Sequence, residues 1–331
     1  MIEILTIDDA LYMQKHDPDF FAEVKKEVSL LDIYTMMDTY AGKQVGHSIE
    51  SYERFMSARQ PETCTTCHGK GVVLPKARGV GTIHPSSANR CVLRLYNDVM
   101  GIKRPREELA PGLRTTFDFG HVAHARVQRA LLAAANWDTE AQVARLDLPD
   151  WDPWVVETRA LGERLAAMEF EFEDEVRVSL PEALIDGGHA DGKFRRTLKV
   201  KRYDVRVGGV LEIKTAGEAD YPKISKPKED HEIQANALYA NALDCPFIDY
   251  IYLGKIFDFK RVFAREFVTV FDPELFEDWC RRKLDPVEKA ITTGVPPTAD
   301  ATSWECGGCG YGSDCKQKRG GQPSGRTTLR K

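Results

Sequence analysis

The sequence predicts an α/β fold, with a mixed-sheet core flanked by helices and an N-terminal helical extension. Before residue 60, apolar residues recur at three- and four-residue steps, which is typical of amphipathic helices. From Ser86 onward, the patterns follow in the order helix, three strands, helix, strand. The chain has 331 residues, of which 42% are hydrophobic, so it is long enough to bury a substantial core.

The first 85 residues are expected to form the helical extension and a connector. Pro61 ends the helical pattern near Gln60, and the segment 61–90 is rich in Gly, Pro, Thr and Cys. This composition indicates an irregular connector or a small metal-bound knuckle. The apolar positions of the helical part are Phe20, Val24, Val28, Leu31, Tyr34 and Met37.

The second region, residues 86–315, carries the core elements, and residues 316–331 form a basic flexible tail. Gly208-Gly209 is a turn signal between two strands. The predicted elements are a helix over 120–136 opened near Asp118, a strand over 168–180, a strand that ends near Asp191 or continues through Val200, a strand over 210–215, a helix over 229–243, strands over 249–256 and 264–271, and a last helix that begins at Asp272-Pro273.

Composition and charge narrow the class of protein. The first residues lack a basic segment followed by an apolar run, and no later stretch approaches a membrane span, so we expect a cytoplasmic protein without a membrane partner. The eight cysteines should then be reduced, and clustered ones indicate metal ligands. A net charge of −5 argues against a uniformly basic nucleic-acid surface, but it leaves a local basic groove open.

An acidic site is predicted around the strand over 210–215. Alternation places Glu212 and Lys214 on one face of this strand, and Asp191 lies upstream at a glycine-flanked bend. Two carboxylates that approach each other favour a cation between them, and oxygen ligands suit Mg²⁺ or Mn²⁺. Such a site can hydrolyse a phosphodiester. The alternative is a solvated ion pair between Glu212 and Lys214.

Two helices carry polar residues that could complete this site. His121, His124 and Gln128 share one face of the helix over 120–136. A neutral imidazole from this face could join a metal shell. His231 and Gln234 lie one turn apart on the next helix, and they are either contacts to the site or surface residues.

The order of these motifs resembles that of the PD-(D/E)XK nucleases, in their RecB-like branch. The matching residues are Gly120-x-x-x-His124, Gly188-His-Ala-Asp191-Gly, Glu212-Ile-Lys214 and Gln234. The resemblance implies a restriction-endonuclease-like core over residues 86–315. It also implies that His124, Asp191 and Glu212 hold Mg²⁺ or Mn²⁺, that Lys214 is the catalytic lysine, and that Gln234 positions the site or the DNA.

The sequence departs from this family's pattern at a tyrosine. In the family a tyrosine commonly follows the glutamine by four residues, whereas here Leu238 holds that position and Tyr239 comes one later. We therefore predict that Tyr239 points to a different helix face, and we give it no role. Asp204 is a rival of Asp191 because the interval from Asp191 to Glu212 is long for a tight hairpin. His121 is a weaker rival of His124.

The cysteines allow two pairings. Cys91 with Cys306-x-x-Cys309-x5-Cys315 is similar to the four-cysteine iron–sulfur signature of AddB-type and CRISPR-associated exonucleases in that branch. This resemblance implies a [4Fe–4S] cluster that joins the C-terminal end of the nuclease to its first helix. A zinc ribbon would instead pair Cys306 and Cys309 with Cys64 and Cys67, and it would leave Cys91 and Cys315 without a role.

If the cluster forms, Cys64 and Cys67 need a separate role. They could bind Zn²⁺, with His68 or His84 completing the shell. The alternative is two reduced thiols in a loop.

The resulting prediction is a phosphodiester hydrolase. We expect a metal-dependent DNA nuclease, an exonuclease on single-stranded DNA or resected ends, that acts in recombination, repair or DNA processing alongside recombination or replication proteins. The first alternative is a DNA-binding or assembly protein with weak or no hydrolysis and a zinc ribbon. The second is a redox protein whose cluster changes oxidation state.

Overall fold

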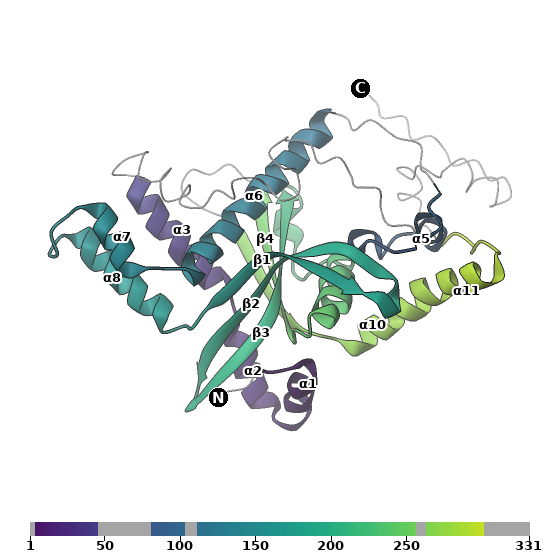
Figure 1. Ribbon diagram of the computed structural model, residues 1–331, viewed down its shortest axis with the longest axis horizontal. Helices are drawn as coiled ribbons and strands as arrows, with labels where there is room; N and C mark the ends of the chain where they lie inside the picture. The colour runs from purple at the N-terminus through teal and green to yellow at the C-terminus, as the bar shows by residue number, and fades with distance from the viewer. Residues whose placement is uncertain (1–3, 46–80, 103–110, 256–262, 301–331) are drawn as a thin grey trace.

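The fold is a mixed five-stranded sheet with helices on both faces (Figure 1). The computed structural model describes residues 4–45, 81–102, 111–255 and 263–300. The strands lie in the order β1-β2-β3-β4-β5. Their bounds are Glu171–Leu180 for β1, Ile185–Val200 for β2, Tyr203–Gly217 for β3, Phe247–Lys255 for β4 and Ala264–Val270 for β5.

Only the central pair of strands in this sheet is parallel. β3 runs parallel to β4, and a helical crossover joins them, whereas the other three pairs are antiparallel. β3 is buried without a break from Val207 to Ile213 and β4 from Phe247 to Leu253, as expected for a parallel pair covered on both faces. The predicted α/β class with a mixed sheet is therefore confirmed.

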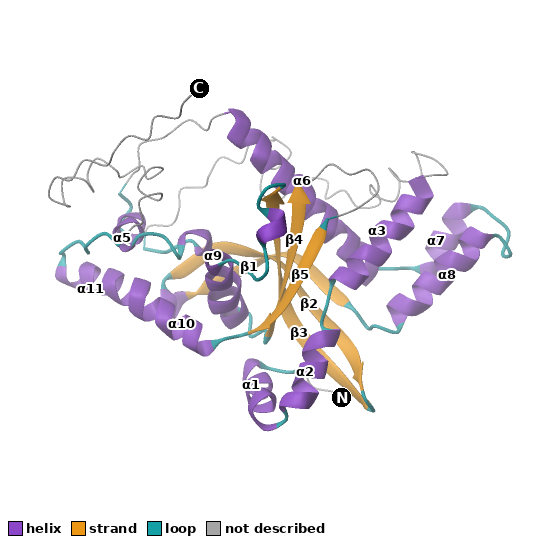
Figure 2. Ribbon diagram, turned by 180° about the vertical axis from the view of Figure 1, so that it is seen from behind, coloured by secondary structure: helices purple, strands orange, loops and turns teal. Residues whose placement is uncertain are grey.

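One face of the sheet packs against the N-terminal helices and a long helix, α6. The buried side chains of this layer include Val24, Ile33 and Leu131 from the helices and Leu211 and Ile251 from the strands. The helices are α1 (Ile7–His16), α2 (Pro18–Glu27), α3 (Leu31–Val45) and α6 (Pro111–Ala135), followed by α7 (Thr139–Leu146) and α8 (Pro153–Ala166), which form a hairpin beside α3 (Figures 1 and 2).

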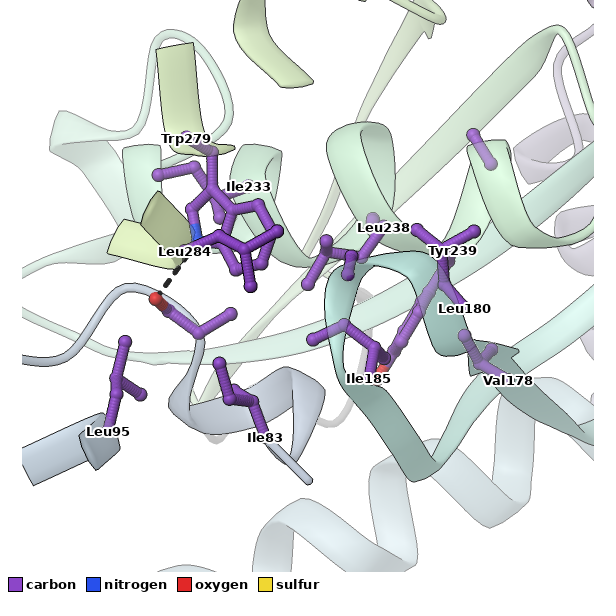
Figure 3. Close-up of a cluster of buried hydrophobic side chains, with 14 of the residues drawn as sticks. Ile83, Leu95, Val178, Leu180, Ile185, Ile233, Leu238, Tyr239, Trp279 and Leu284 are labelled. Carbon is purple, nitrogen blue, oxygen red and sulfur yellow. Dashed lines mark hydrogen bonds between the residues drawn. The ribbon is translucent and has the colours of Figure 1, made fainter. Parts of the chain in front are cut away.

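The other face packs against the remaining helices. Trp279 is fully buried in this layer, and its indole N–H donates to the backbone oxygen of Ala88, 3.0 Å away (Figure 3). This hydrogen bond ties the C-terminal helices to the segment before α5. The elements are α5 (Val92–Val99), α9 (Glu229–Glu232), the π-helical segment η4 (Ile233–Ala240), α10 (Pro273–Trp279), η5 (Cys280–Leu284) and α11 (Asp285–Thr293).

Short polar residues begin several of these helices. Asp17, Asp152 and Asp272 each cap a helix through a side-chain oxygen, and each precedes a proline at the first helical position. The predicted start at Asp272-Pro273 is confirmed. Asp118, in contrast, does not open a helix, because α6 already begins at Pro111.

The predicted turn at Gly208-Gly209 is wrong, because both residues lie inside β3. A Cβ on Gly209 would come within 2.3 Å of the Phe194 ring and 2.9 Å of the Phe247 carbonyl oxygen, so glycine is required there for close packing. The chain reverses instead after Val200, where Lys201 has a positive φ of 56°.

Across the described ranges, no helix combines the length and the apolar character that a membrane crossing requires.

Candidate active site

Asp191 lies where β2 separates from β3. The register between these strands begins at the next residue, Gly192, opposite Leu211. The Asp191 side chain bridges the gap, since its Oδ2 accepts a 2.6 Å hydrogen bond from the backbone N–H of Ile213. Its Oδ1 lies 3.1 Å from Nδ1 of His124 on α6. Asp191 therefore joins a helix and two strands at one point.

The predicted bend at Asp191 is wrong, because β2 continues through this residue without interruption. Gly187 has a positive φ of 80°, whereas Gly188 and Gly192 serve close packing. A Cβ on Gly188 would meet the ring of Pro85 at 2.3 Å, and a Cβ on Gly192 would meet the ring of Phe172 at 2.4 Å.

Gln128 fixes the backbone beside Asp191. Its side chain is 7% exposed, and its amide donates to the Asp191 carbonyl oxygen (2.7 Å) and to Oε1 of Glu175 (3.2 Å). Glu175 lies opposite Asp191 on β1, between two register pairs, with a positive φ of 52°. Non-glycine residues rarely adopt this conformation, which costs about 1–3 kcal/mol. The left-handed conformation of Glu175 in β1 thus lets its carboxylate accept a hydrogen bond from Gln128.

Glu212 and Lys214 are paired inside the protein. The carboxylate of Glu212 is 1% exposed, and the Lys214 ammonium lies against its Oε1. No other described residue offers this oxygen a hydrogen bond. On the neighbouring parallel strand, Tyr250 lies beside Glu212 and Tyr252 beside Lys214. The solvated ion pair that the sequence left open is therefore wrong, because Glu212 is buried and only part of the Lys214 side chain reaches the surface.

Burial and mutual charge set the ionisation of these groups. Burial raises the pKa of Glu212 to about 7, against the opposing effect of Lys214. Burial also disfavours the charge of Asp191, but the hydrogen bond and charge of His124 outweigh it and lower the Asp191 pKa. Burial lowers the pKa of His124, but its interaction with Asp191 outweighs burial and raises this pKa. Burial likewise lowers the pKa of Lys214, but the charges of Glu212 and Asp191 outweigh it and raise this pKa. These directions favour the charged forms of Asp191, Lys214 and His124, and they bring the pKa of Glu212 close to neutral pH.

Tyr239 faces Gln234, which corrects the prediction that it points elsewhere. In a π-helix, hydrogen bonds join residues five apart, so residues i and i+5 lie above one another. Gln234 and Tyr239 fall in the π-helical segment η4, and the Gln234 amide donates to the Tyr239 hydroxyl at 2.5 Å. Burial, and secondarily the charge of Glu212, raise the pKa of Tyr239 well above its usual value, which places this pair near the carboxylates.

A second tyrosine connects His231 to the site. The Tyr252 hydroxyl lies 2.6 Å from Nδ1 of His231 and accepts a 3.1 Å hydrogen bond from the backbone N–H of Lys228. Burial, followed by the charges of Lys214 and Lys228, lowers the pKa of His231 to about 3. His231 is therefore a neutral imidazole beside the proposed catalytic lysine.

The two rival residues lie away from this arrangement. His121 is an exposed residue of α6 without a contact to Asp191. Asp204 pairs in register with Lys199 near the tip of the β2–β3 hairpin. Eight residues separate it from Glu212 along one strand, a distance of roughly 27 Å at the usual rise. Asp191 is therefore the aspartate that the fold brings to Glu212 and Lys214.

The donor chemistry fits Mg²⁺ or Mn²⁺, although the side chains are not arranged around one point. Two carboxylates and an imidazole suit these ions, and Oε1 of Glu212 is a buried oxygen that among the described residues has only Lys214 as a partner. Within the described ranges, however, no three His, Cys, Asp or Glu side chains are placed to hold one metal ion. Binding at this place therefore requires Lys214 to leave Glu212 and His124 to reorient about Asp191.

One predicted cluster ligand, Cys91, is described, and the C-terminal segment returns to it. Cys91 is a buried free thiol at the start of α5. The next residue, Val92, donates its backbone N–H to Asp300 at 2.7 Å, and Lys283 donates to the same carboxylate at 2.7 Å. Cys306 follows Asp300 by six residues, which can span at most about 20 Å.

The other predicted cysteine ligands are not described. Cys306, Cys309 and Cys315 lie outside the described residues, as do Cys64, Cys67 and His68. His84, the other candidate zinc ligand, is described, and its Nδ1 lies 2.8 Å from the Ser86 hydroxyl.

Sequence patterns missed several polar residues around the site. Tyr239 was missed because a tyrosine four residues after Gln234 was expected. The interval of five residues between Gln234 and Tyr239 was the available signal of a π-helical segment. Glu175 and Tyr252 gave no such signal, since one falls in an acidic alternating strand and the other in an aromatic buried strand. Gln128 was detectable only by its helical face shared with His124.

Comparison with known proteins identifies no family. No protein-family model matches the chain, and no curated protein matches it. The matching solved structures include that of SSO0001, with 17% identity and a TM-score of 0.32 over 74% of this chain and 90% of that one. They also include an alkaline exonuclease, LHK-Exo, from Laribacter hongkongensis, with 14% identity and a TM-score of 0.30 over 66% of this chain and 92% of that one. Both scores are too low to assign a function.

Proposed function

We propose that the protein is a metal-dependent DNA nuclease of the PD-(D/E)XK type, in the RecB-like branch. One observation carries the proposal, namely that the partly buried Asp191, Lys214 and His124 gather around the buried Glu212. Holding two acids, a lysine and a histidine together with little access to water is costly unless the group has a task. The order of the sequence motifs supports the same assignment.

Each of these residues has a separate role in phosphodiester hydrolysis. Asp191, Glu212 and His124 would hold Mg²⁺ or Mn²⁺, which lowers the pKa of a bound water and polarises the phosphate. Lys214, released from Glu212, orients the attacking water and stabilises the negative charge that develops on the phosphate. Gln234, held by Tyr239, positions the substrate beside this lysine.

The substrate is proposed to be single-stranded DNA or a resected end, cut from its terminus during recombination, repair or DNA processing. Recombination or replication proteins are the expected partners. A DNA-binding or assembly protein with weak hydrolysis remains the alternative. The buried Glu212–Lys214 pair favours hydrolysis, since binding to a DNA backbone requires exposed cations rather than a buried ion pair.

A [4Fe–4S] cluster held by Cys91, Cys306, Cys309 and Cys315 is proposed as a structural clasp. The anchoring of Asp300 at Val92 and Lys283 supports it, because this contact directs the C-terminal segment toward Cys91. Iron analysis and a visible spectrum of anaerobically purified protein test it. We expect about four iron atoms per chain, lost on Cys91→Ala but not on Cys245→Ala. A zinc-only, colourless protein would favour the ribbon formed with Cys64 and Cys67.

The nuclease proposal is tested by incubating the purified protein with end-labelled single-stranded, blunt and resected DNA. Mg²⁺ or Mn²⁺ should support release of short products, with single-stranded and resected DNA preferred over blunt duplex. Asp191→Ala should abolish cleavage. Cleavage that survives this substitution would show that the activity comes from another site.

A further inference from the structure

The hydrogen-bond chain from Lys228 through Tyr252 to His231 has no part in the function described so far. Tyr252 is 1% exposed, so its hydroxyl can satisfy its bonds only within the protein. The oxygen accepts from the Lys228 backbone N–H at 3.1 Å and lies 2.6 Å from Nδ1 of His231. This chain determines which ring nitrogen of His231 carries a hydrogen.

Satisfaction of the Tyr252 hydroxyl selects one tautomer of His231. If Nδ1 accepts the hydroxyl hydrogen, every group in the chain has a partner and the ring hydrogen lies on Nε2. If Nδ1 carried the hydrogen instead, the buried hydroxyl would lose its acceptor, at a cost of about 1–3 kcal/mol. His231 is therefore a neutral donor through Nε2, which makes no hydrogen bond to the described residues.

His231 lies against the wall of the proposed active site. Tyr252 is the cross-strand neighbour of Lys214, and His231 precedes Gln234 by one helical turn. The charges of Lys214 and Asp191 both act on the imidazole, so these groups are close enough to interact. The ring is therefore held, through Tyr252, close to the proposed catalytic lysine.

We propose that His231 is a further catalytic residue, which donates its Nε2–H to a non-bridging oxygen of the scissile phosphate. This inference rests on the proposed nuclease function. A neutral donor suits this place, because a second buried cation beside Lys214 would be repelled. The donor is held in advance by Tyr252, so it stabilises the charge of the transition state without reorganisation.

Two substitutions at His231 separate this role from a structural one. His231→Gln places an amide N–H near the position of Nε2, whereas His231→Leu removes the donor. We expect His231→Leu to lower kcat about 100-fold, the effect of losing one such donor, and His231→Gln to restore at least tenfold of that loss. His16→Leu, which removes an exposed histidine of α1, should leave kcat unchanged. Equal losses in both His231 variants would show a packing role and overturn the proposal.

Substrate stereochemistry gives a second test. A phosphorothioate at the cleaved position replaces one non-bridging oxygen by sulfur, a poor hydrogen-bond acceptor. One of its two stereoisomers should lower the rate of the native protein more than that of His231→Leu. If both proteins show the same sulfur effects with both stereoisomers, His231 does not contact the phosphate.

The tautomer can be measured without any activity. Histidine ¹⁵N NMR of the metal-free protein should show His231 neutral, with the hydrogen on Nε2, and Tyr252→Phe should relax this preference. A protonated ring or a hydrogen on Nδ1 near neutral pH would contradict the inference. If the native protein does not cut DNA, the nuclease proposal fails; if it cuts as fast as His231→Leu, only the role of His231 fails.

Discussion

The Gln234 amide and the Tyr239 hydroxyl form a 2.5 Å hydrogen bond across five residues of one helix. An α-helix would place residues four apart above one another, so the two side chains would diverge. The π-helical segment η4 absorbs the extra residue and returns Tyr239 to the face of Gln234. Departures from α-helical geometry of this kind often mark functional sites.

Loss of the Tyr239 hydroxyl should impair cleavage. Tyr239→Phe frees the Gln234 amide, so we expect kcat to fall about tenfold, equivalent to ~1.4 kcal/mol of transition-state stabilisation. Tyr96→Phe, a buried tyrosine of α5 in the same core layer, is the control and should retain full activity. An unchanged kcat in Tyr239→Phe, measured under single-turnover conditions, would show that the pair only packs.

The pKa of Glu212 predicts a pH-dependent stability of the metal-free protein. Its pKa rises from an ordinary 4.5 to about 7 on folding, so the stability from its protonated form is present below about pH 4.5 and is lost as pH rises through 7. The Tm of Glu212→Gln relative to the native Tm should therefore increase between about pH 5.5 and pH 8.5. A difference that stays constant over this range would mean that Glu212 does not titrate there.

Mn²⁺ bound at Glu212 should stabilise the protein more as pH rises, opposite to the pH trend of the metal-free protein. Metal ligands must be deprotonated, so Mn²⁺ should raise the native Tm more at about pH 8.5 than at about pH 5.5. Glu212→Gln should lose most of this stabilisation. Equal stabilisation of both proteins would place the metal elsewhere.

Asp249 is a buried acid of β4 that faces the start of α3, and Asp249→Asn should stabilise the protein at higher pH. Burial, followed by the neighbouring Glu266, raises the Asp249 pKa well above its usual value. The protonated form contributes stability at low pH, and this stability is lost as pH rises through the raised pKa. In the native protein the backbone N–H of Leu30 donates a 2.8 Å hydrogen bond to Asp249. The side-chain oxygen of asparagine can accept this bond, and its amide N–H can donate to Glu266 at any pH.

Thermal unfolding across pH tests the Asp249 prediction. The gain in Tm for Asp249→Asn should grow from acid to alkaline pH and reach a few degrees, as expected for about 1 kcal/mol. Asp19→Asn, at an exposed position of α2, should show no such trend. A gain that shrinks with rising pH would contradict the assignment.

The neighbouring glycines of β3 should differ in their tolerance of alanine. Gly209→Ala places a Cβ against Phe194 and the Phe247 carbonyl, so we expect the free energy of unfolding to fall by about 1–3 kcal/mol. Gly208→Ala meets Ile4 at 3.5 Å and the Phe194 carbonyl oxygen at 3.8 Å, both ordinary contact distances, so its effect should stay within about 0.5 kcal/mol. Denaturant unfolding measures both, and equal effects would contradict the packing role of Gly209.

Local patterns in the sequence were sufficient to predict a mixed sheet and most of its strands along the chain. The strands over 168–180, 249–256 and 264–271 were predicted close to their observed bounds, because alternation and apolar runs are local signals. The position of Asp191 opposite Glu212 followed from motif order. It did not follow from geometry, since the expected bend at Asp191 does not exist.

Features that depend on distant contacts were not predictable. Gly209 carries a turn signal, but the rings and carbonyl that require glycine there come from β2 and β4. The π-helical segment η4 cannot be seen in apolar periodicity, and the left-handed conformation of Glu175 occurs where the residue falls between two register pairs of β1 and β2. The hydrogen bonds of Gln128 and Tyr252 likewise join residues that are far apart in the chain.

The most direct test of the account is the rate at which Lys214→Ala cleaves single-stranded DNA with Mg²⁺ or Mn²⁺, compared with the native protein. We expect the native protein to cut and the variant to lose at least ~100-fold in rate while it still folds and binds DNA, because Lys214 supplies charge to the transition state. Native-like cleavage by Lys214→Ala, or no metal-dependent cleavage by either protein, would contradict the account.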